Sequence, residues 1–353
     1  MPDNGENGAL DVVTFGEALI DLAPASPHVM ESSELDEAGS PASPLYAAHP
    51  GGAPANVAVG LARLGCRAGF IGKVGRDGFG RLIGETLRVC GVDTGGLVWA
   101  DGVATTLVIV DIGEGGERSF TFHRNPGADS TLTPEEVPLA SIERAAVFHF
   151  GSVSLTREPA RAATLRALAH ARRSRCLISF DPNVRLSLWD SPEAARQAIF
   201  DCLPMVDVLK VSDEELTLLT GERDAARGAD RLQAEFSVPL LFVTLGKNGC
   251  YYRHPTREGY VPAPDVQAVD TTGAGDAFVA GVLSQLSARW VLSRRGPVDL
   301  PRIARFANAV AALSTTRRGG IPAMPTRSEV DELLGQWIEG GHTDAADGPG
   351  DRF

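Results

Sequence analysis

The sequence lacks two nucleotide-binding motifs that many enzymes carry. No G-x-x-x-x-G-K-[ST] phosphate loop occurs, because neither Gly72-Lys73 nor Gly246-Lys247 is followed by Ser or Thr. No G-x-G-x-x-G follows a predicted strand. These absences exclude a P-loop enzyme and a Rossmann-type dehydrogenase.

Clustered cysteines and long apolar runs are also missing. The five cysteines are far apart in the sequence, and no Cys-x-x-Cys occurs. A dispersed, odd set predicts reduced thiols in a cytoplasmic protein. No apolar run approaches roughly 18 residues, which predicts that no segment spans a membrane. The acidic, Gly-rich residues 1–11 lack the basic and apolar regions of a secretory signal.

Basic residues are outnumbered by acidic ones. The chain has 33 Lys and Arg against 45 Asp and Glu, a formal net charge of −12. This balance argues against a nucleic-acid partner, which needs a basic face. It does not exclude an anionic small substrate, because one site can be locally positive. The 353 residues, 43% apolar and 22% charged, fit an ordinary globular protein of one or two domains.

Short apolar, β-branched segments alternate with helical patterns along the chain. Strands are predicted at 11–16, 67–75, 146–152, 176–183, 207–212 and 240–246. Helices are predicted at 55–65, 79–91, 158–173, 213–221, 275–286 and 302–316. This alternation predicts an α/β fold with a doubly wound, mostly parallel sheet and helices on both faces.

Two segments interrupt the alternation. Residues 25–48, rich in Ser, Pro, Ala and Glu, predict a loop insertion. Residues 104–124 contain two β-rich runs around a Gly-rich centre, which predicts a hairpin. We therefore expect a small β element projecting from the main sheet. Its exposed edge would need protection, for example by pairing with a second copy of the chain.

The sharpest motif is Asp-Thr-Thr-Gly-Ala-Gly-Asp at residues 270–276, just before an apolar helix. Gly273, Ala274 and Gly275 would present backbone N–H groups at a helix N-terminus, an arrangement that holds anionic oxygens. Asp276 would be an ionised carboxylate beside this cradle, suited to accept a proton from a hydroxyl that attacks a phosphoryl group. The alternative is that Asp276 only caps the helix.

A second motif, Pro-Gly-Gly-Ala-Pro-Ala-Asn at residues 50–56, precedes another predicted helix. The glycine pair lets the backbone approach a ligand closely. Asn56 offers both a donor and an acceptor, as a sugar hydroxyl requires. The alternative is a flexible turn before an ordinary helix.

Taken together, these two motifs resemble the signatures of the PfkB (ribokinase-like) carbohydrate kinases. The resemblance runs from about Val12 to about Thr326. Within the family the sequence is most similar to fructokinases in four segments: GEALID (16–21), PGGAPAN (50–56), FHRNPGAD (122–129) and KVSDEE (210–215).

The resemblance implies roles for individual residues. Asp276 would be the catalytic base, and Gly273, Ala274 and Gly275 the anion hole for the transferring phosphoryl group. Residues implied to contact the substrate are Asp21, Gly51, Gly52, Asn56, Arg124, Asp181, Asn183 and Arg185. Residues implied to bind ATP are Ser212, Glu215, Thr244, Gly246, Gly249 and Asn308.

The resemblance also implies metal ions. In the family's N-x-x-E motif the Glu organises a hydrated Mg²⁺; here Glu215 stands at that position, and Ser212 replaces the Asn. Asp270 and Thr272 are similar to positions that build a K⁺ loop. Two roles stay open for Glu17: its carboxylate accepts hydrogen bonds from local backbone N–H groups, or it binds a ligand.

The implied architecture is a single ribokinase-like domain over residues 11–340. A β lid would be formed by about 17–50 and 98–128, and residues 1–10 and 341–353 would be flexible tails. We also expect a cytoplasmic homodimer that pairs through the lid.

The predicted activity is ATP-dependent phosphorylation of a sugar primary hydroxyl, chiefly D-fructose to fructose 6-phosphate. The nearest alternative is 2-keto-3-deoxygluconate, whose carboxylate would need Arg contacts such as Arg124 and Arg185. Ribose or a nucleoside comes next. A non-catalytic sugar-binding protein on the same scaffold is a further alternative, although a pure binder has no use for Asp276.

Overall fold

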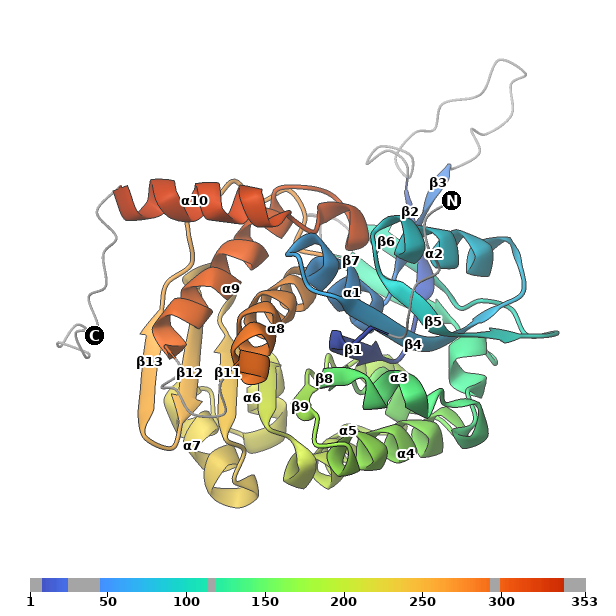
Figure 1. Cartoon of the computed structure of the whole chain (residues 1–353), viewed down its shortest axis with the longest axis horizontal. Coiled ribbons are helices and arrows are strands. Elements are labelled where there is room, and N and C mark those ends of the chain that lie inside the picture. Colours follow the sequence, from blue (N-terminus) through green and yellow to red (C-terminus); the bar gives the residue numbers. More distant parts are fainter. Residues whose placement is uncertain (1–7, 25–44, 113–117, 293–298, 340–353) are drawn as a thin grey trace, which may run out of the picture.

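The computed structural model describes residues 8–24, 45–112, 118–292 and 299–339 (Figure 1). A nine-stranded sheet runs through the molecule in the order β13-β12-β11-β10-β9-β8-β1-β4-β5. Its strands are β1 (Leu10–Phe15), β4 (Ala68–Gly75), β5 (Asp93–Ala100), β8 (Ala145–Phe150), β9 (Leu177–Phe180), β10 (Val208–Ser212), β11 (Leu240–Thr244), β12 (Cys250–His254) and β13 (Arg257–Val261).

Seven of these strands form a parallel sheet, and β12 and β13 extend it as antiparallel neighbours. All eight residues of β4 are buried, as expected for a parallel strand covered on both faces. The predicted α/β fold with a large, mostly parallel sheet is therefore confirmed.

Helices cover both faces of the large sheet (Figure 1). Side chains of α1 (Ala53–Arg63), α2 (Gly78–Val89), α8 (Ala274–Leu292), α9 (Leu300–Thr315) and α10 (Arg327–Glu339) contribute to one apolar cluster. The other contains side chains of α3 (Leu139–Glu143), α4 (Ala160–Arg173), α5 (Pro192–Cys202), α6 (Asp213–Thr220) and α7 (Ala225–Phe236). The neighbouring residues Val12 and Val13 fall in different clusters, because successive strand side chains point to opposite faces.

A second sheet of four strands has the order β3-β2-β6-β7. Its strands are β2 (Leu19–Pro24), β3 (Tyr46–Gly51), β6 (Leu107–Ile112) and β7 (Arg118–His123). Strands β6 and β7 pair antiparallel, which confirms the predicted hairpin. Strand β2 begins four residues after β1 ends, so the small sheet is attached directly at the carboxyl edge of the large one.

Some predicted boundaries differ from the structure. Leu10, assigned to a tail, begins β1 and is buried, because it pairs with Ala145. The end of the predicted 25–48 loop is strand β3, which pairs with β2. Residues 25–44 of that loop, the hairpin centre at 113–117, and residues 1–7 and 341–353 of the predicted tails lie outside the described residues.

Candidate active site at the carboxyl edge of the large sheet

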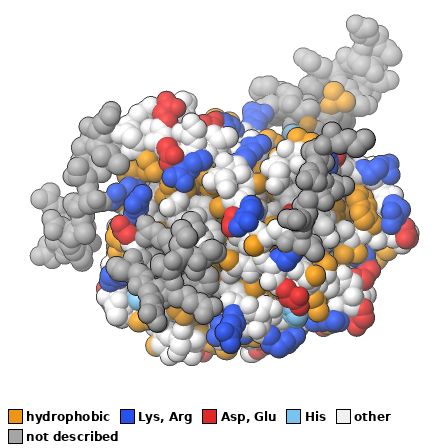
Figure 2. All heavy atoms as spheres, in the orientation of Figure 1, with side chains coloured by type: hydrophobic (Ala, Val, Ile, Leu, Met, Phe, Trp, Pro, Cys, Tyr) orange, Lys and Arg blue, Asp and Glu red, His pale blue; other side chains and the backbone are white. Residues whose placement is uncertain are grey.

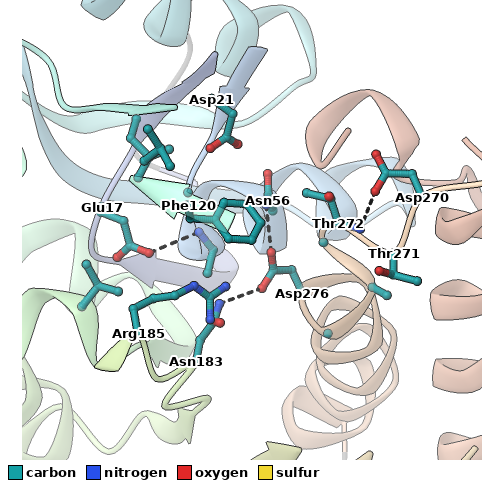
Figure 3. A pocket seen from close by; sticks show the side chains of 18 of the residues that line it. Glu17, Asp21, Asn56, Phe120, Asn183, Arg185, Asp270, Thr271, Thr272 and Asp276 are labelled. Carbon is teal, nitrogen blue, oxygen red and sulfur yellow. Dashed lines mark hydrogen bonds between the residues drawn. The ribbon is translucent and has the colours of Figure 1, made fainter. Parts of the chain in front are cut away.

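A cavity of about 580 Å³ lies between the small sheet and the start of α8 (Figure 3). Ligands in doubly wound folds bind beyond the carboxyl ends of the strands, which is where this cavity opens. Eleven of the residues predicted for the site line it: Asp21, Gly52, Asn56, Asn183, Arg185, Asp270, Thr272, Gly273, Ala274, Gly275 and Asp276.

Asp276 stands in the first turn of α8 and is 6% exposed. One carboxylate oxygen accepts from Nδ2 of Asn56 at 2.8 Å, and the other from Nδ2 of Asn183 at 3.5 Å. Burial raises the pKa of Asp276 from 3.8 to about 7, even though Asn56 and Lys210 favour the charged form. A carboxylate with this pKa can take up and release a proton near neutrality.

The turn before α8 brings backbone N–H groups next to Asp276. Gly273 has φ +76°, and its carbonyl oxygen accepts the helical bond from Ala277 N at 2.8 Å. The N–H groups of a first helical turn have no acceptor within the helix and can bind an anion. Ala274 N already donates to the Thr271 carbonyl oxygen at 3.2 Å, so this amide is engaged within the turn.

Lys210, the middle residue of β10, was not among the predicted site residues, although it lines the cavity. Its Nζ would lie 2.9 Å from a Cβ added at Gly275, so the ammonium lies against the predicted anion hole. Nζ also pairs with Asp181 at 3.1 Å. Burial opposes the charge of Lys210, but the nearby carboxylates, Asp181 foremost, raise its pKa. Asp181 thus contributes to the site by holding this ammonium.

The small sheet and the start of α1 form the opposite wall. Burial raises the pKa of Asp21, on β2, to about 6, and Arg185 counteracts this shift. A Cβ at Gly51 would lie 2.5 Å from Asp21 Oδ2, so Gly51 makes room for this carboxylate without lining the cavity. Oδ1 of Asn56 is buried and has no hydrogen-bond partner among the described residues. An unsatisfied buried acceptor suits a ligand hydroxyl.

Glu17 occupies the same wall and is 4% exposed. Its Oε1 accepts from Ala53 N at 3.2 Å, whereas its buried Oε2 has no partner among the described residues. Burial raises its pKa to about 7. Glu17 therefore satisfies a backbone donor, which is one of the two roles that the sequence left open. Its place on the cavity wall leaves ligand binding as a prediction.

Apolar side chains from the hairpin cover the cavity. Phe120 and Phe122 on β7 and Val108 on β6 line it, and Figure 3 shows the Phe120 ring among the side chains that surround the pocket. Alternating residues of a strand share one face, so 120 and 122 point the same way. Sequence reasoning missed them, because their alternation shows a strand but not what its inner face covers.

Residues predicted to bind ATP lie at the ends of β10 and β11, where Ser212 and Thr244 are register partners. Ser212 and Glu215 form a capping box at the start of α6. Oε1 of Glu215 also accepts from Val184 N at 2.7 Å, which ties α6 to the loop that carries Asn183.

The remaining predicted nucleotide residues follow β11 and β13. Gly246 and Gly249 have positive φ values of 55° and 95° in the turn between β11 and β12. A Cβ at Gly249 would lie 2.1 Å from the Val261 carbonyl oxygen. Asn308 Nδ2 donates to the carbonyl oxygens of Val261 and Pro262. These residues keep the β12–β13 end of the sheet packed against α9.

Arg124, predicted to reach the substrate, does not line the cavity. Its side chain is 4% exposed and pairs with Asp129 at 2.7 Å. The sequence places Arg124 at the end of the hairpin but gives no sign that its charge is already paired.

Asp270 and Thr272 form the loop before α8. One Asp270 oxygen accepts from Thr272 N and the other from Gly319 N, both at 2.8 Å. The carboxylate thus links this loop to the segment after α9. Among the described residues, no three His, Cys, Asp or Glu side chains are grouped closely enough to hold a metal by themselves.

Comparisons with known proteins agree with one another. The sequence profile described as "pfkB family carbohydrate kinase" matches residues 9–327. Fructokinase-1 of Zea mays is 45% identical over 323 residues, which cover 92% of this chain and 97% of the relative.

Two solved structures resemble the fold. Fructokinase from Xylella fastidiosa with bound ATP has a TM-score of 0.82 and 33% identity, covering 93% of this chain and 99% of that one. A fructokinase double mutant from Vibrio cholerae O395, in a form bound to fructose, ADP and potassium ion, has a TM-score of 0.81 and 35% identity, covering 93% and 100%.

Proposed function

The chain belongs to the pfkB family of carbohydrate kinases, and from this premise we propose that it transfers the γ-phosphoryl group of ATP to the primary hydroxyl of D-fructose, giving fructose 6-phosphate. The observation that carries the proposal is the buried carboxylate of Asp276 at the start of α8, inside the cavity. The relatives named as fructokinases and the solved fructokinase bound to fructose and ADP support this substrate.

Asp276 acts as the general base. It accepts the proton of the attacking hydroxyl while Asn56 and Asn183 fix the orientation of its two oxygens. Phosphoryl transfer depends on positioning and on stabilising charge at the equatorial oxygens. The Gly273–Gly275 turn offers backbone donors for that charge, and Lys210 offers a cation against the same turn.

The sugar occupies the wall formed by the small sheet and α1. Asp21, Asn56 and Glu17 present oxygen acceptors there, and Phe120 and Phe122 cover the opening. Excluding water matters because water competes with the sugar for the phosphoryl group. The small sheet is therefore the lid of the site.

ATP brings Mg²⁺ with it. Mg²⁺ keeps several waters and needs only one or two carboxylates besides the phosphates, so a single Glu215 near the nucleotide residues fits this ion. Each oxygen of Glu215 accepts one backbone N–H and keeps a second lone pair. The ion supplies charge neutralisation on the phosphates. We assign K⁺ to the Asp270–Thr272 loop on the basis of the family resemblance; bound there, it would steady the turn.

A sugar panel tests the substrate assignment. ADP release is measured with D-fructose, ribose, a nucleoside and 2-keto-3-deoxygluconate, and we expect D-fructose to give the highest kcat/KM. Preference for the keto-acid by tenfold or more would overturn the assignment. Absence of turnover with every member would favour a sugar-binding protein without catalysis.

We further propose that two chains pair through their lids. Strands β3 and β7 are the edges of the small sheet among the described residues, and Leu45, just before β3, and Tyr46, its first residue, are 69% and 39% exposed. Light scattering after gel filtration should give the mass of two chains, and Leu45→Glu should give one. Val89→Glu, at an equally exposed position on α2, is the control. A wild-type mass of one chain would contradict the dimer.

We place the protein in the cytoplasm, in a reducing environment. The five cysteines are free thiols in the structure, and reduced thiols are typical of such a compartment. Among the described helices, none combines the length and apolar character that crossing a bilayer requires. Figure 2 shows acidic and basic side chains mixed over one face of the molecule. Cell fractionation with an activity assay tests the compartment.

A further inference from the structure

A buried ion pair lies behind the sugar side of the cavity. Arg124 and Asp129 are only 4% and 2% exposed, and Arg124 Nε donates to Asp129 Oδ2 at 2.7 Å. Arg124 follows β7 directly, and Asp129 lies in the 3₁₀ turn Ala128–Thr131. A pair at this depth is shielded from water, so the charge of each partner is strongly offset by the other.

The surroundings leave this pair little freedom. Nη1 of Arg124 donates to Thr156 Oγ1 at 2.8 Å, and Nη2 lies 3.4 Å from the Val153 carbonyl oxygen. Thr106 Oγ1 donates to the second oxygen of Asp129. A Cβ at Gly127 would lie 1.7 Å from Thr106 Oγ1, so only glycine permits this packing.

The pair is close enough to the cavity to affect what binds there. Val153, which accepts from Arg124, lines the cavity. Glu17, on the cavity wall, senses both charges: beyond the dominant effect of burial, Asp129 raises its pKa and Arg124 lowers it. An unpaired positive charge on Arg124 would therefore interact electrostatically with a bound substrate.

The other charges around the cavity disfavour an anionic sugar. Four acidic residues, Glu17, Asp21, Asp270 and Asp276, line it. Among the described lining residues, the cations are Arg185 and Lys210, and Lys210 is held by Asp181. A sugar acid must bring a fifth carboxylate into this space and lose its hydration, whereas a neutral sugar brings no charge.

We propose that Asp129 is a specificity-determining residue: by neutralising Arg124 it makes the site accept a neutral sugar and reject a sugar acid of similar size. This inference rests on the proposed sugar kinase function. Asp129 touches neither substrate nor reacting atoms; it acts through the charge of Arg124. The ion pair also explains why Arg124, which the sequence offered as a contact for a carboxylate substrate, is not available to bind one.

The test compares Asp129→Asn with the wild type on D-fructose and on 2-keto-3-deoxygluconate. Asparagine keeps the size and the acceptor for Thr106 but removes the negative charge. We expect kcat/KM for the acid relative to fructose to rise at least tenfold, mainly through a lower KM for the acid. The control Asp101→Asn removes a carboxylate from the exposed pair with Arg76 and should leave the ratio within twofold.

Two further variants keep the inference testable if Asp129→Asn does not fold. Arg124→Gln leaves the charge of Asp129 uncompensated, and the inhibition constant of the acid against fructose should rise about tenfold. The double variant Arg124→Gln/Asp129→Asn carries neither charge, so its kcat/KM for the acid relative to fructose should stay within threefold of the wild-type ratio. A tenfold gain in the double variant, or no change in either folded single variant, would overturn the inference.

The outcomes separate this inference from the proposed function. If the wild-type protein does not phosphorylate fructose, the proposed function fails whatever the variants do. If the wild type phosphorylates fructose and Asp129→Asn folds with an unchanged ratio, the specificity role alone fails.

Discussion

Replacing Asp276 by Asn separates a catalytic base from a helix cap. Asparagine has the same shape and also caps helices well, but it cannot accept a proton. Loss of a general base lowers turnover by about 10²–10⁴-fold, equivalent to ~3–5 kcal/mol of transition-state stabilisation. We expect kcat to fall by at least a hundredfold in a coupled ADP-release assay, with fructose binding retained by calorimetry.

The same substitution should stabilise the folded protein at alkaline pH. Burial raises the pKa of Asp276 from 3.8 to about 7, so the folded state favours the protonated carboxyl. The stability contributed by this proton is fully present below about pH 4 and is lost as pH rises through about 7. Asp276→Asn removes the buried charge, so its Tm should exceed that of the wild type at pH 8 and match it at pH 4.

The pH dependence of activity supplies a third readout. A base must be ionised to act, so wild-type kcat/KM should fall about tenfold per unit as pH drops below about 7. Asp299→Asn, at the exposed cap of α9, is the matched control and should leave activity and Tm unchanged. Turnover of Asp276→Asn within tenfold of wild type, or a lower Tm at pH 8, would refute the reasoning and favour a structural cap.

Three other substitutions test the walls of the site. Glu17→Gln removes a carboxylate oxygen that has no partner among the described residues, so the KM for fructose should rise about tenfold. The variant also removes a buried charge, so its Tm at pH 8 should increase. An unchanged KM would argue against a sugar contact. Phe120→Ala, at a residue 38% exposed on the lid, should raise the fructose KM about tenfold, ~1.4 kcal/mol, with a small effect on kcat; a large fall in kcat alone would contradict a covering role. Lys210→Met leaves Asp181 buried and unpaired, and urea unfolding should show a loss of about 3–5 kcal/mol; a loss below about 1 kcal/mol would show that the pair is not needed.

Much of the fold follows from local patterns that the sequence displays. The strand predicted at 240–246 is β11 (Leu240–Thr244), and the helix predicted at 302–316 is α9 (Leu300–Thr315). Strand β3 was missed because its residues, Tyr46–Gly51, include one proline and one glycine and show no apolar alternation. The strand is stabilised by its pairing with β2. Helix α8 was predicted too short, because Ser287 and Arg289 interrupt its apolar pattern without ending the helix.

The alternation of strands and helices, the Gly-rich turn before α8 and the position of Asp276 in its first turn could be predicted, because each depends on residues a few positions apart. Three contacts could not be predicted and appear only on folding: Asn56 bonds to Asp276 across 220 positions, Lys210 lies against the turn, and Asp129 forms an ion pair with Arg124. Burial and charge pairing depend on neighbours that the chain brings together from distant segments, so the protonation of Asp276 and the charge available to a substrate exist only in the folded protein.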